Sequence, residues 1–312
     1  MEVVTLTPRG YCHGVVHAIG VLKRLAYDES IKRPIYVLGW VVHNEKIVSD
    51  FEDLGIKTLH DQGKTRLDLL DEVENGTVVF TAHGVSDQVF KKAKDKGLDI
   101  IDTTCKDVKV SQDTVKQYLA DGYDVIFIGK QNHPESETVL SYHTHNVHLV
   151  SNLEDIKALQ IDNTQIALTN QTTMSLFDVY QLTESILNNY PQTTVIEELC
   201  DATKTRQLAV MHQDSSIEHC FVVGDPKSNN SNKLVSVSIE NGVNASLIEG
   251  VEDLDIDHLK TLKKVSVTSG ASTPTQLTKE VTMFLSQFNK NLPETHDTTS
   301  KVKKKNLFTT KW

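Results

Sequence analysis

Three of the four cysteines of this 312-residue chain recur at almost the same interval. Cys12 and Cys105 are 93 residues apart, and Cys105 and Cys200 are 95 residues apart. A feature that returns at one period indicates a repeated structural unit. Cys220 falls outside the period. The spacing therefore predicts three similar segments that each contribute one equivalent cysteine.

Each segment has the pattern of alternating strands and helices. A β-rich run precedes each periodic cysteine, at residues 3–6, 99–101 and 194–196, and a helix-like segment follows it. A second strand ends near a glycine in IYVLG, VIFIG and CFVVG, and a third lies in TVVFTAHG, QIALTNQTT and VSVTSGAST. This alternation is typical of parallel α/β units. We expect an α/β fold with three similar domains in a pseudo-threefold arrangement.

The same period divides the chain into predicted domains. The first α/β unit covers residues 1–94, the second 95–192 and the third 193–288, and the first strand of the chain could pack with the third unit. Residues 289–312 depart from the pattern and end in a lysine-rich run. We expect this last segment to be a solvated, mobile tail.

The composition narrows the classes of protein that fit. A net charge of -10 and a pI near 5.7 disfavour a nucleic-acid-binding surface, because such surfaces are usually basic. No run approaches the roughly eighteen apolar residues of a membrane helix, and the N-terminus lacks a signal-peptide pattern. Four widely spaced cysteines do not suit a secreted disulfide framework. We therefore expect a cytoplasmic protein that binds neither nucleic acid nor membrane.

Parallel α/β sheets bind ligands beyond the carboxyl ends of their strands, where loops meet helix N-termini. Three units that face one axis would bring Cys12, Cys105 and Cys200 together there. Three thiolates would form a metal or cluster site, because disulfide pairing would leave one over. The alternative is that each cysteine is a small buried hydrophobic residue. Cys220 begins a strand, and we assign it to the structure.

Histidine and glutamate side chains also follow predicted strands. His133 and Glu135 lie in GKQNHPESE, His43 lies in GWVVHN and His83 lies in TAHGVS. Imidazole and carboxyl groups at strand ends suggest proton transfer in a catalytic site. An exposed turn or a helix cap would explain each of them individually.

Hydroxyl and amide side chains are concentrated in other loops. The third segment contains PKSNNSNK and SGAST, whose side chains can donate to phosphate oxygens together with backbone N–H groups. In the second segment, Thr172 or Thr173 of QTTMS could hydrogen-bond a substrate. Turn and N-cap chemistry, which favours Ser, Thr and Asn, is the alternative for these loops.

A series of ordered motifs through residues 1–288 carries a resemblance to a known family. The motifs are PRGYCHGVVHAI, VVHN, FTAHGVS, DTTC, HPE, NQTTMS, ELCDATKTRQ, VGDPKSNNSNKL and TSGASTPT. On these motifs the chain resembles the 4-hydroxy-3-methylbut-2-enyl diphosphate reductases, which catalyse the last step of the non-mevalonate isoprenoid pathway.

The resemblance implies an iron-sulfur oxidoreductase. Cys12, Cys105 and Cys200 would hold a central 4Fe-4S cluster whose fourth iron has no protein ligand. The enzyme would remove the allylic hydroxyl of its diphosphate substrate with two electrons and two protons, which gives isopentenyl and dimethylallyl diphosphate and water. Ferredoxin or flavodoxin would supply the electrons. An open iron could act as a Lewis acid toward the departing oxygen.

The resemblance also assigns roles to individual side chains. Glu135 would protonate the leaving hydroxyl, and His133 and Thr172 would complete the relay. The diphosphate would be bound by a set of imidazole, hydroxyl and amide groups. This set comprises His43, His83, His133, Thr172, Thr173, Ser228, Asn229, Asn230 and Ser272.

Three positions depart from the family pattern. Lys106 stands where Pro usually follows the second cysteine, Asn132 replaces a common Gly before HPE, and Asn229 stands where Ser is frequent. None of these changes removes a predicted ligand or proton donor. They put the geometry of the loops in question rather than the activity.

Two other functions fit part of the pattern. A quinolinate-synthase-like dehydratase also combines three related α/β domains with a three-cysteine cluster, but its chemistry is not reductive. A non-catalytic metal sensor would use the cysteines but gives no reason for the His, Glu and Thr side chains. Product analysis with and without a reductant distinguishes the dehydratase from a reductase. A diphosphate-binding titration distinguishes the metal sensor from an enzyme that acts on a diphosphate.

Overall fold

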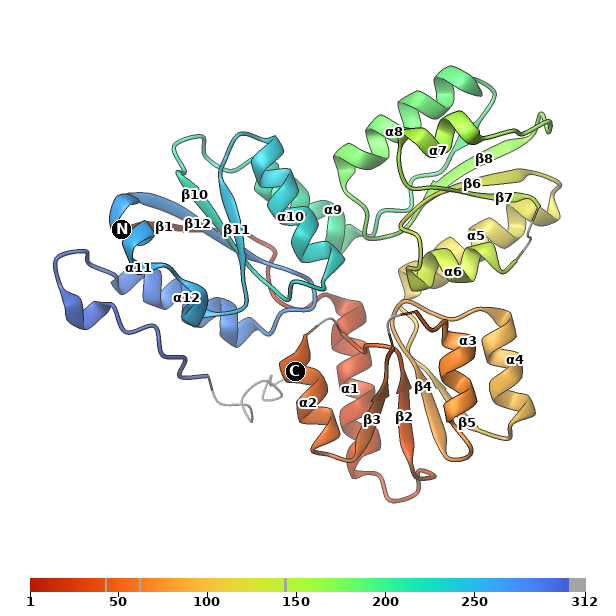
Figure 1. Ribbon diagram of the computed structural model, residues 1–312, viewed down its shortest axis with the longest axis horizontal. Helices are drawn as coiled ribbons and strands as arrows, with labels where there is room; N and C mark the ends of the chain where they lie inside the picture. The colour runs from red at the N-terminus through yellow and green to blue at the C-terminus, as the bar shows by residue number, and fades with distance from the viewer. Residues whose placement is uncertain (43, 62, 143–144, 303–312) are drawn as a thin grey trace. The chain divides into compact units, whose positions relative to one another are not determined.

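The computed structural model describes residues 1–302 except residues 43, 62, 143 and 144. Within the described residues it contains three parallel sheets of four strands each (Figure 1). The chain divides into two compact units. The first unit comprises residues 1–13, 42–50 and 201 onward, and the second comprises residues 14–41 and 51–200.

The first unit contains one sheet. Its strands are β1 (Glu2–Thr5), β10 (His219–Val223), β11 (Ala245–Ile248) and β12 (Lys264–Ser269), in the order β1-β12-β10-β11. The helices after residue 200 are α9 (Asp201–Met211), α10 (Asn229–Glu240), α11 (Ile256–Thr261) and α12 (Thr275–Gln287). Short 3-10 turns lie at Val251–Asp253 and Pro293–Thr295.

The second unit contains two sheets. One has the order β3-β2-β4-β5 and consists of β2 (Ile35–Leu38), β3 (Ile56–Leu59), β4 (Thr77–Phe80) and β5 (Asp99–Asp102). The other has the order β7-β6-β8-β9 and consists of β6 (Asp124–Ile128), β7 (Val147–Val150), β8 (Ile166–Asn170) and β9 (Thr194–Val195).

Helices alternate with these strands along the chain. None of the helices within the described residues has both the length and the hydropathy of a membrane span. Before residue 100 they are α1 (His13–Tyr27), α2 (Glu45–Glu52), α3 (Arg66–Leu69), a 3-10 turn at Leu70–Glu72, and α4 (Asp87–Asp95). Between residues 100 and 200 they are α5 (Lys106–Ala120), α6 (Pro134–Leu140), α7 (Leu153–Ala158) and α8 (Leu176–Asn189).

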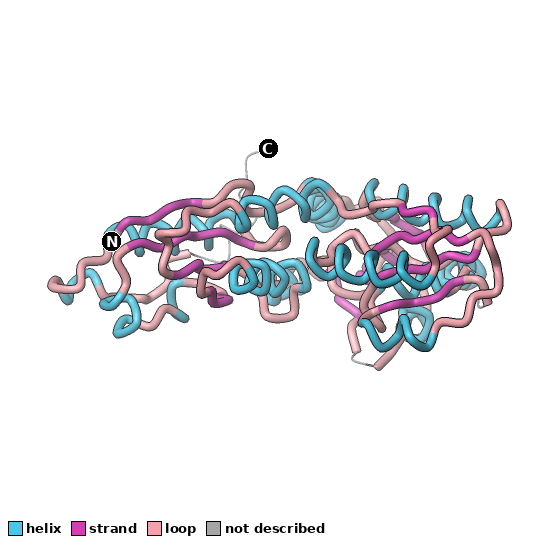
Figure 2. The backbone as a smooth tube through the Cα atoms, turned by 90° about the horizontal axis from the view of Figure 1, so that it is seen from above, coloured by secondary structure: helices cyan, strands magenta, loops and turns pink. Residues whose placement is uncertain are grey.

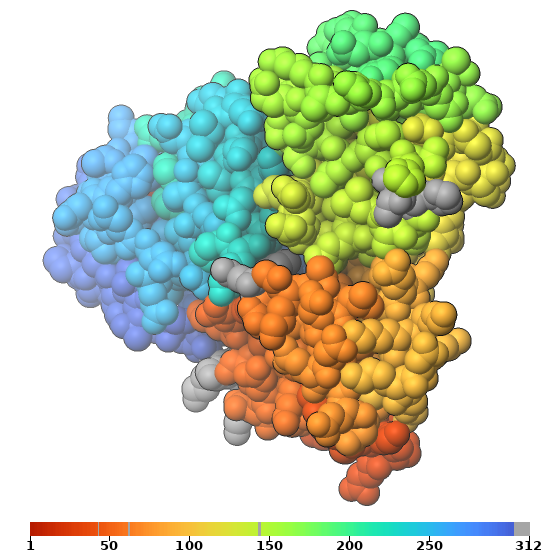
Figure 3. Space-filling model, turned by 45° about the vertical axis from the view of Figure 1, so that its right-hand side comes forward, coloured from red at the N-terminus to blue at the C-terminus, as the bar shows by residue number. Residues whose placement is uncertain are grey.

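All three sheets have the same strand order. In each, two central strands are flanked on one side by a short edge strand and on the other by the strand that leads to the next periodic cysteine. The space-filling view in Figure 3 shows that residues of similar colour, which are close in sequence, mostly gather together on the surface. The expected α/β fold with three similar domains is therefore confirmed.

Sheet membership differs from the predicted domain boundaries by one strand. β5 follows residue 94 and β9 follows residue 192, yet β5 pairs with β4 and β9 pairs with β8. The reason is that α4 and α8 are crossover helices between parallel strands, and such a crossover returns the chain to the same sheet. No sequence repeat precedes β1 in the chain. This strand pairs instead with β12, near the other end of the chain.

The strand β6 shows how a sheet is covered on both faces. All five of its residues are buried. Ile126 and Ile128 pack against α7 and α8, and Val125 and Phe127 pack against α5 and α6. Burial of side chains of this size stabilises the fold by about 1.5–3 kcal/mol each. Figure 2 shows strands lying between helices in this way, which leaves the loops at the strand ends to carry the polar side chains.

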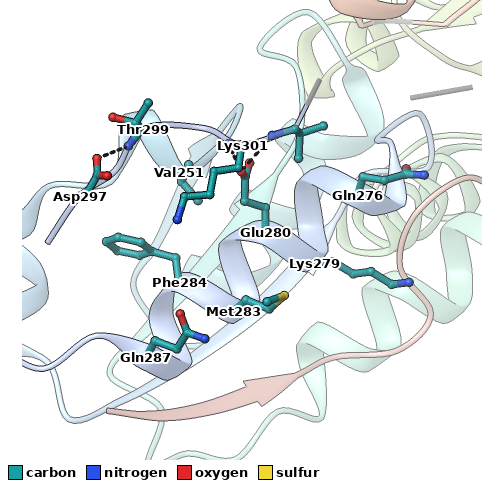
Figure 4. A pocket seen from close by; sticks show the side chains of 11 residues that line it. Val251, Gln276, Lys279, Glu280, Met283, Phe284, Gln287, Asp297, Thr299 and Lys301 are labelled. Atoms are coloured by element: carbon teal, nitrogen blue, oxygen red, sulfur yellow. Dashed lines mark hydrogen bonds between the residues drawn. The ribbon is translucent and has the colours of Figure 1, made fainter. Parts of the chain in front are cut away.

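The segment after residue 288, which we expected to be mobile, makes defined contacts up to residue 302. The ring of His296 stacks on Phe288 with centroids 4.9 Å apart. The carboxylate of Glu280 accepts a hydrogen bond from Ser300 Oγ at 2.8 Å. It also accepts hydrogen bonds from the backbone N–H groups of residues 301 and 302 (Figure 4). The predicted tail beyond this point, with most of the lysine-rich run, lies outside the described residues.

Candidate functional site

The loops after β6 and β8 carry a buried carboxyl group. From β6 the chain continues to β7 at one edge of the sheet, and from β8 it continues to β9 at the opposite edge. Their loops therefore lie at a topological switch point, where open α/β sheets usually bind ligands. Glu135, the second residue of α6, lies there, and its side chain is only 4% exposed.

Glu135 is held by a threonine and a histidine. The backbone N–H of Thr172 donates to Oε2 at 2.9 Å, and the Thr172 hydroxyl donates to Oε1 at 3.1 Å. Oε1 also lies 3.2 Å from Nδ1 of His83, whose side chain is 22% exposed. The three residues form a hydrogen-bonded chain that runs from a partly exposed imidazole to a buried hydroxyl.

His133 lies beside this chain. It is the N-cap of α6, and its Nδ1 accepts the backbone N–H of Glu135 at 3.2 Å. A neutral imidazole that accepts at Nδ1 carries its proton on Nε2 and can donate it to an anion. The His133 ring also meets the His83 ring edge to face, with centroids 5.1 Å apart. The structure therefore brings together four of the predicted site residues, and Thr173 follows Thr172 in the chain.

Asn132 adopts a backbone conformation that explains why it can replace glycine. Its φ is +61°, in the left-handed region. Glycine enters this region most easily, and asparagine enters it more easily than most other residues. The replacement is therefore compatible with the turn that presents His133.

Two chemical interpretations fit the group of His83, His133 and Glu135. One possible ligand atom from each lies within 4.8 Å of the others, so the group could hold a divalent cation or share protons. Glu135 already accepts two hydrogen bonds from Thr172. Proton sharing therefore fits the observed geometry better than metal binding.

Each of the three periodic cysteines is held in the same way by its own sheet. Its backbone N–H donates to the carbonyl oxygen of the residue two places after the strand that pairs with the strand leading to that cysteine, which is β12 for Cys12, β4 for Cys105 and β8 for Cys200. The N···O distances are 3.0 Å for Cys12 to Ala271, 3.0 Å for Cys105 to Ala82 and 3.2 Å for Cys200 to Thr172.

Each periodic cysteine also directly precedes a helix. Helices α1, α5 and α9 begin one residue after Cys12, Cys105 and Cys200, and all three thiols are partly exposed. A partly exposed cysteine sulfur at such a position can bind a metal. Cys220 instead lies inside β10, where burial raises the pKa of its thiol. The chemistry of the three periodic thiols fits a metal or cluster centre, and that of Cys220 does not.

The loops after β10 and β12 carry hydroxyl and amide groups. Ser228 is the N-cap of α10, and Asn230 accepts the backbone N–H of Ala271 on its Oδ1 at 3.0 Å. Ser272 Oγ lies 3.4 Å from Ser228 Oγ. Within the described residues, the buried Nδ2 of Asn230 has no hydrogen-bond partner. Such an orphaned donor at the N-terminus of a helix suits an anion.

The segment that follows β2 is tied to the same loop. The backbone N–H of Glu45 donates to Asp225 Oδ2 at 3.3 Å, and Lys227 Nζ lies 2.5 Å from Glu45 Oε1. Asp225 is buried and also accepts the backbone N–H of Lys227 at 2.7 Å. His43, the predicted diphosphate ligand of this segment, lies outside the described residues.

The sequence analysis missed one buried arginine. Arg206 is 3% exposed and donates to the carbonyl oxygens of Gly10 at 2.7 Å and Ala202 at 2.8 Å. It thereby joins the turn before Cys12 to the first turn of α9. An alignment of the three repeats could have found it, because the equivalent positions hold small residues, Ala18 and Ser111.

Three repeated parallel sheets, partly exposed thiols at helix N-termini and a buried carboxyl group define a cysteine-containing α/β enzyme. The chain belongs to the LytB protein family, whose model matches residues 3–286.

The curated relatives are similar over nearly the whole chain. A 4-hydroxy-3-methylbut-2-enyl diphosphate reductase of Brevibacillus brevis is 49% identical over 296 residues, which are 95% of this chain and 94% of that protein. A reductase of the same name from Geobacillus sp. (strain WCH70) is 46% identical over 303 residues, 97% of this chain and 96% of that protein.

Solved structures give the same result. The E-1-hydroxy-2-methyl-but-2-enyl-4-diphosphate reductase of Plasmodium falciparum matches with a TM-score of 0.85 and 31% identity, over 93% of this chain and 89% of that one. A second structure, of (E)-4-hydroxy-3-methyl-but-2-enyl diphosphate reductase, matches with a TM-score of 0.64 and 26% identity, over 92% of this chain and all of that one.

Proposed function

We propose that this chain is a 4-hydroxy-3-methylbut-2-enyl diphosphate reductase. It removes the allylic hydroxyl of that substrate with two electrons and two protons, and it releases isopentenyl and dimethylallyl diphosphate and water. The observation that carries the proposal is the buried Glu135 between Thr172 and His83, in a chain that matches reductases over nearly its full length. Cleavage of the C–O bond needs a proton for the leaving oxygen, and this group can supply it.

The electrons require a redox centre, and the family implies an iron-sulfur cluster. We assign Cys12, Cys105 and Cys200 as the ligands of a 4Fe-4S cluster, because each is a partly exposed thiol at a helix N-terminus. When bound, the cluster would supply electrons and a Lewis-acidic iron for the departing oxygen. Ferredoxin or flavodoxin is the proposed electron donor, and the proposed location is the cytoplasm.

The residues of the second unit would move the proton. His83 is the more exposed end of the hydrogen-bonded chain and would take a proton from solvent. Glu135 would receive it and pass it through the Thr172 hydroxyl, which it contacts directly, to the leaving oxygen. His133 would orient Glu135 by accepting its backbone N–H.

The diphosphate would be bound mainly by neutral donors. In the third repeat, Ser228, Asn229 and Asn230 lie at the N-terminus of α10, and Ser272 lies in the loop that follows β12. The orphaned Nδ2 of Asn230 supports this assignment. In the other repeats we assign His43, His83, His133, Thr172 and Thr173 to the same anion.

The test is product analysis with protein that has been purified and reconstituted without oxygen. We expect conversion of the hydroxylated allylic diphosphate to both products only when a reductant is present. Mössbauer spectra with and without substrate should show a 4Fe-4S cluster with one iron that responds to the substrate. Turnover without a reductant would favour the dehydratase, and diphosphate binding without turnover would favour a sensor.

A further inference from the structure

A partly buried ion pair joins the two sheets of the second unit close to Glu135. Nη1 of Arg66, the first residue of α3, lies 3.4 Å from Oε2 of Glu137 in α6. The two side chains are 14% and 26% exposed. Since α3 leads into β4 and α6 follows β6, the pair connects the sheet that carries His83 with the sheet that carries Glu135.

Burial distinguishes this pair from a surface ion pair. It lowers the pKa of the Arg66 guanidinium and raises the pKa of the Glu137 carboxyl, and the opposite charge of each partner offsets part of the effect. The guanidinium also lies against the backbone of Gly39, where an added Cβ would be 2.9 Å from Nη2. Removal of one partner would leave the other charge partly buried without its counter-ion, which is costly.

The helix α6 depends on such contacts because it is short. Its seven residues are too few to hold a helical conformation in isolation. Glu135 and Glu137 are two positions apart and therefore lie on opposite sides of the helix. Thr172 and His83 hold Glu135 on one side, and Arg66 holds Glu137 on the other.

We propose that Arg66 and Glu137 are positioning residues for the proton relay, an inference that rests on the proposed function. Their ion pair fixes the rotation of α6 about its axis and so keeps Glu135 within hydrogen-bond distance of His83 and Thr172. A displacement of about 1 Å in a catalytic group can lower a rate by roughly 100-fold. The pair therefore acts on the chemical step rather than on substrate binding.

A second ion pair provides a matched control. Lys116 of α5 and Asp87 of α4 also join helices of the two sheets, with Nζ 3.0 Å from Oδ1, but their side chains are 41% and 73% exposed. Exposed pairs contribute little to stability. Asp87→Asn removes the charge of one partner, as Glu137→Gln does, but neither partner of this pair belongs to α6.

The test compares kcat, KM and the solvent deuterium isotope effect on kcat in the holoenzyme, with rates expressed per bound cluster. For Glu137→Gln we expect kcat to fall by about tenfold or more, KM to stay within about threefold, and the isotope effect to increase because proton delivery has become slower. Arg66→Lys keeps the charge and should retain part of the lost rate. Asp87→Asn should behave like the wild type.

Amide hydrogen exchange gives a readout that does not need turnover. Exchange at residues 135–140 should be faster in Glu137→Gln than in the wild type or in Asp87→Asn. Wild-type kcat in Glu137→Gln would overturn the inference, as would a lower kcat with unchanged exchange and an unchanged isotope effect. An inactive wild-type holoenzyme would instead overturn the proposed function, and exchange would then decide on the ion pair alone.

Discussion

Glu135 of the second repeat and Asn230 of the third repeat occupy equivalent positions. Each is the second residue of its helix, α6 or α10. Each accepts a backbone N–H from the residue two places after a central strand of its sheet, at 2.9 Å from Thr172 and at 3.0 Å from Ala271. The two repeats therefore place different chemical groups at one position of the same scaffold.

Close packing at the strand ends is also shared. Gly129 and Gly224 follow the central strands β6 and β10, and Ser136 and Ser231 stand seven residues after them. A Cβ at these glycines would lie 2.7 and 2.3 Å from the serine Oγ atoms, so both loops require glycine. The comparison shows that the repeated backbone fixes where a side chain lies, while the residue type places a carboxyl there in one repeat and a carboxamide in the other. We propose that the carboxyl transfers a proton and that the carboxamide binds an anion.

The cysteines test what the repeats have in common, and their replacement should have the largest effect. Cys105→Ser in the second repeat and Cys12→Ser in the first repeat each remove one proposed cluster ligand. Both variants should therefore lose most of the bound iron and sulfide and nearly all activity. Cys220→Ser should keep the cluster. Equal iron content in Cys105→Ser and Cys220→Ser would contradict the ligand assignment.

Replacement of the carboxyl tests what separates the repeats. Glu135→Gln should keep the cluster and lower kcat by about 100-fold or more, because an amide cannot deliver the proton. Glu154→Gln, on an exposed part of α7, is the control and should be unaffected. Steady-state rates with iron analysis measure both effects. Normal turnover of Glu135→Gln would remove this residue from the mechanism.

The reciprocal change in the third repeat should affect binding instead. Asn230→Asp places a carboxylate near the proposed diphosphate site and should raise KM and the inhibition constant of pyrophosphate by about tenfold or more, through like-charge repulsion and loss of a donor. The effect of Asn230→Ala should be smaller. Ser236→Ala, on an exposed part of α10, serves as the control. A lower kcat with unchanged KM would contradict the division between the two repeats.

The first residues of β10 and β6 should make the stability of the fold depend on acidic pH in different ways. Burial and the nearby His258 lower the pKa of His219, the first residue of β10, to about 4. Unfolded chains bind the proton near pH 6.5, so the stability from neutral His219 should be lost as the pH falls from about 6.5 to about 4, by about 1 to 3 kcal/mol. His219→Gln should flatten this part of the dependence of unfolding free energy on pH.

The equivalent first residue of β6 is Asp124. Burial acts to raise its pKa, but hydrogen bonds from His148, Asn163 and Asn146 outweigh burial and lower it. Its contribution to stability should therefore be complete above about pH 4 and be lost only below that value. Urea unfolding at a series of pH values measures both changes. If the free energy of unfolding fell equally below pH 4 in Asp124→Asn and in the wild type, the pH dependence in this range could not be assigned to Asp124.

Sequence patterns predicted much of the site because the residues that carry it repeat or follow strands. The period of Cys12, Cys105 and Cys200 indicated equivalent positions, and the structure shows the same backbone hydrogen bond at each. Sheet membership at β5 and β9 was not predicted, because a strand and its crossover helix look the same in sequence whichever sheet they join. Arg66 and Glu137 were also missed, since a contact across 71 residues leaves no local pattern.

The sequence by itself determined the fold class, the three repeats and the kinds of groups that stand at strand ends, because hydrophobic period and spacing are local properties of the chain. Only the tertiary structure decided that His83 and Thr172, from different sheets, meet on Glu135. It also decided that the buried Nδ2 of Asn230 finds no partner among the residues that the structure describes. Hydrogen bonds of this kind depend on distances of a few tenths of an ångström between segments far apart in the chain, and packing alone sets those distances.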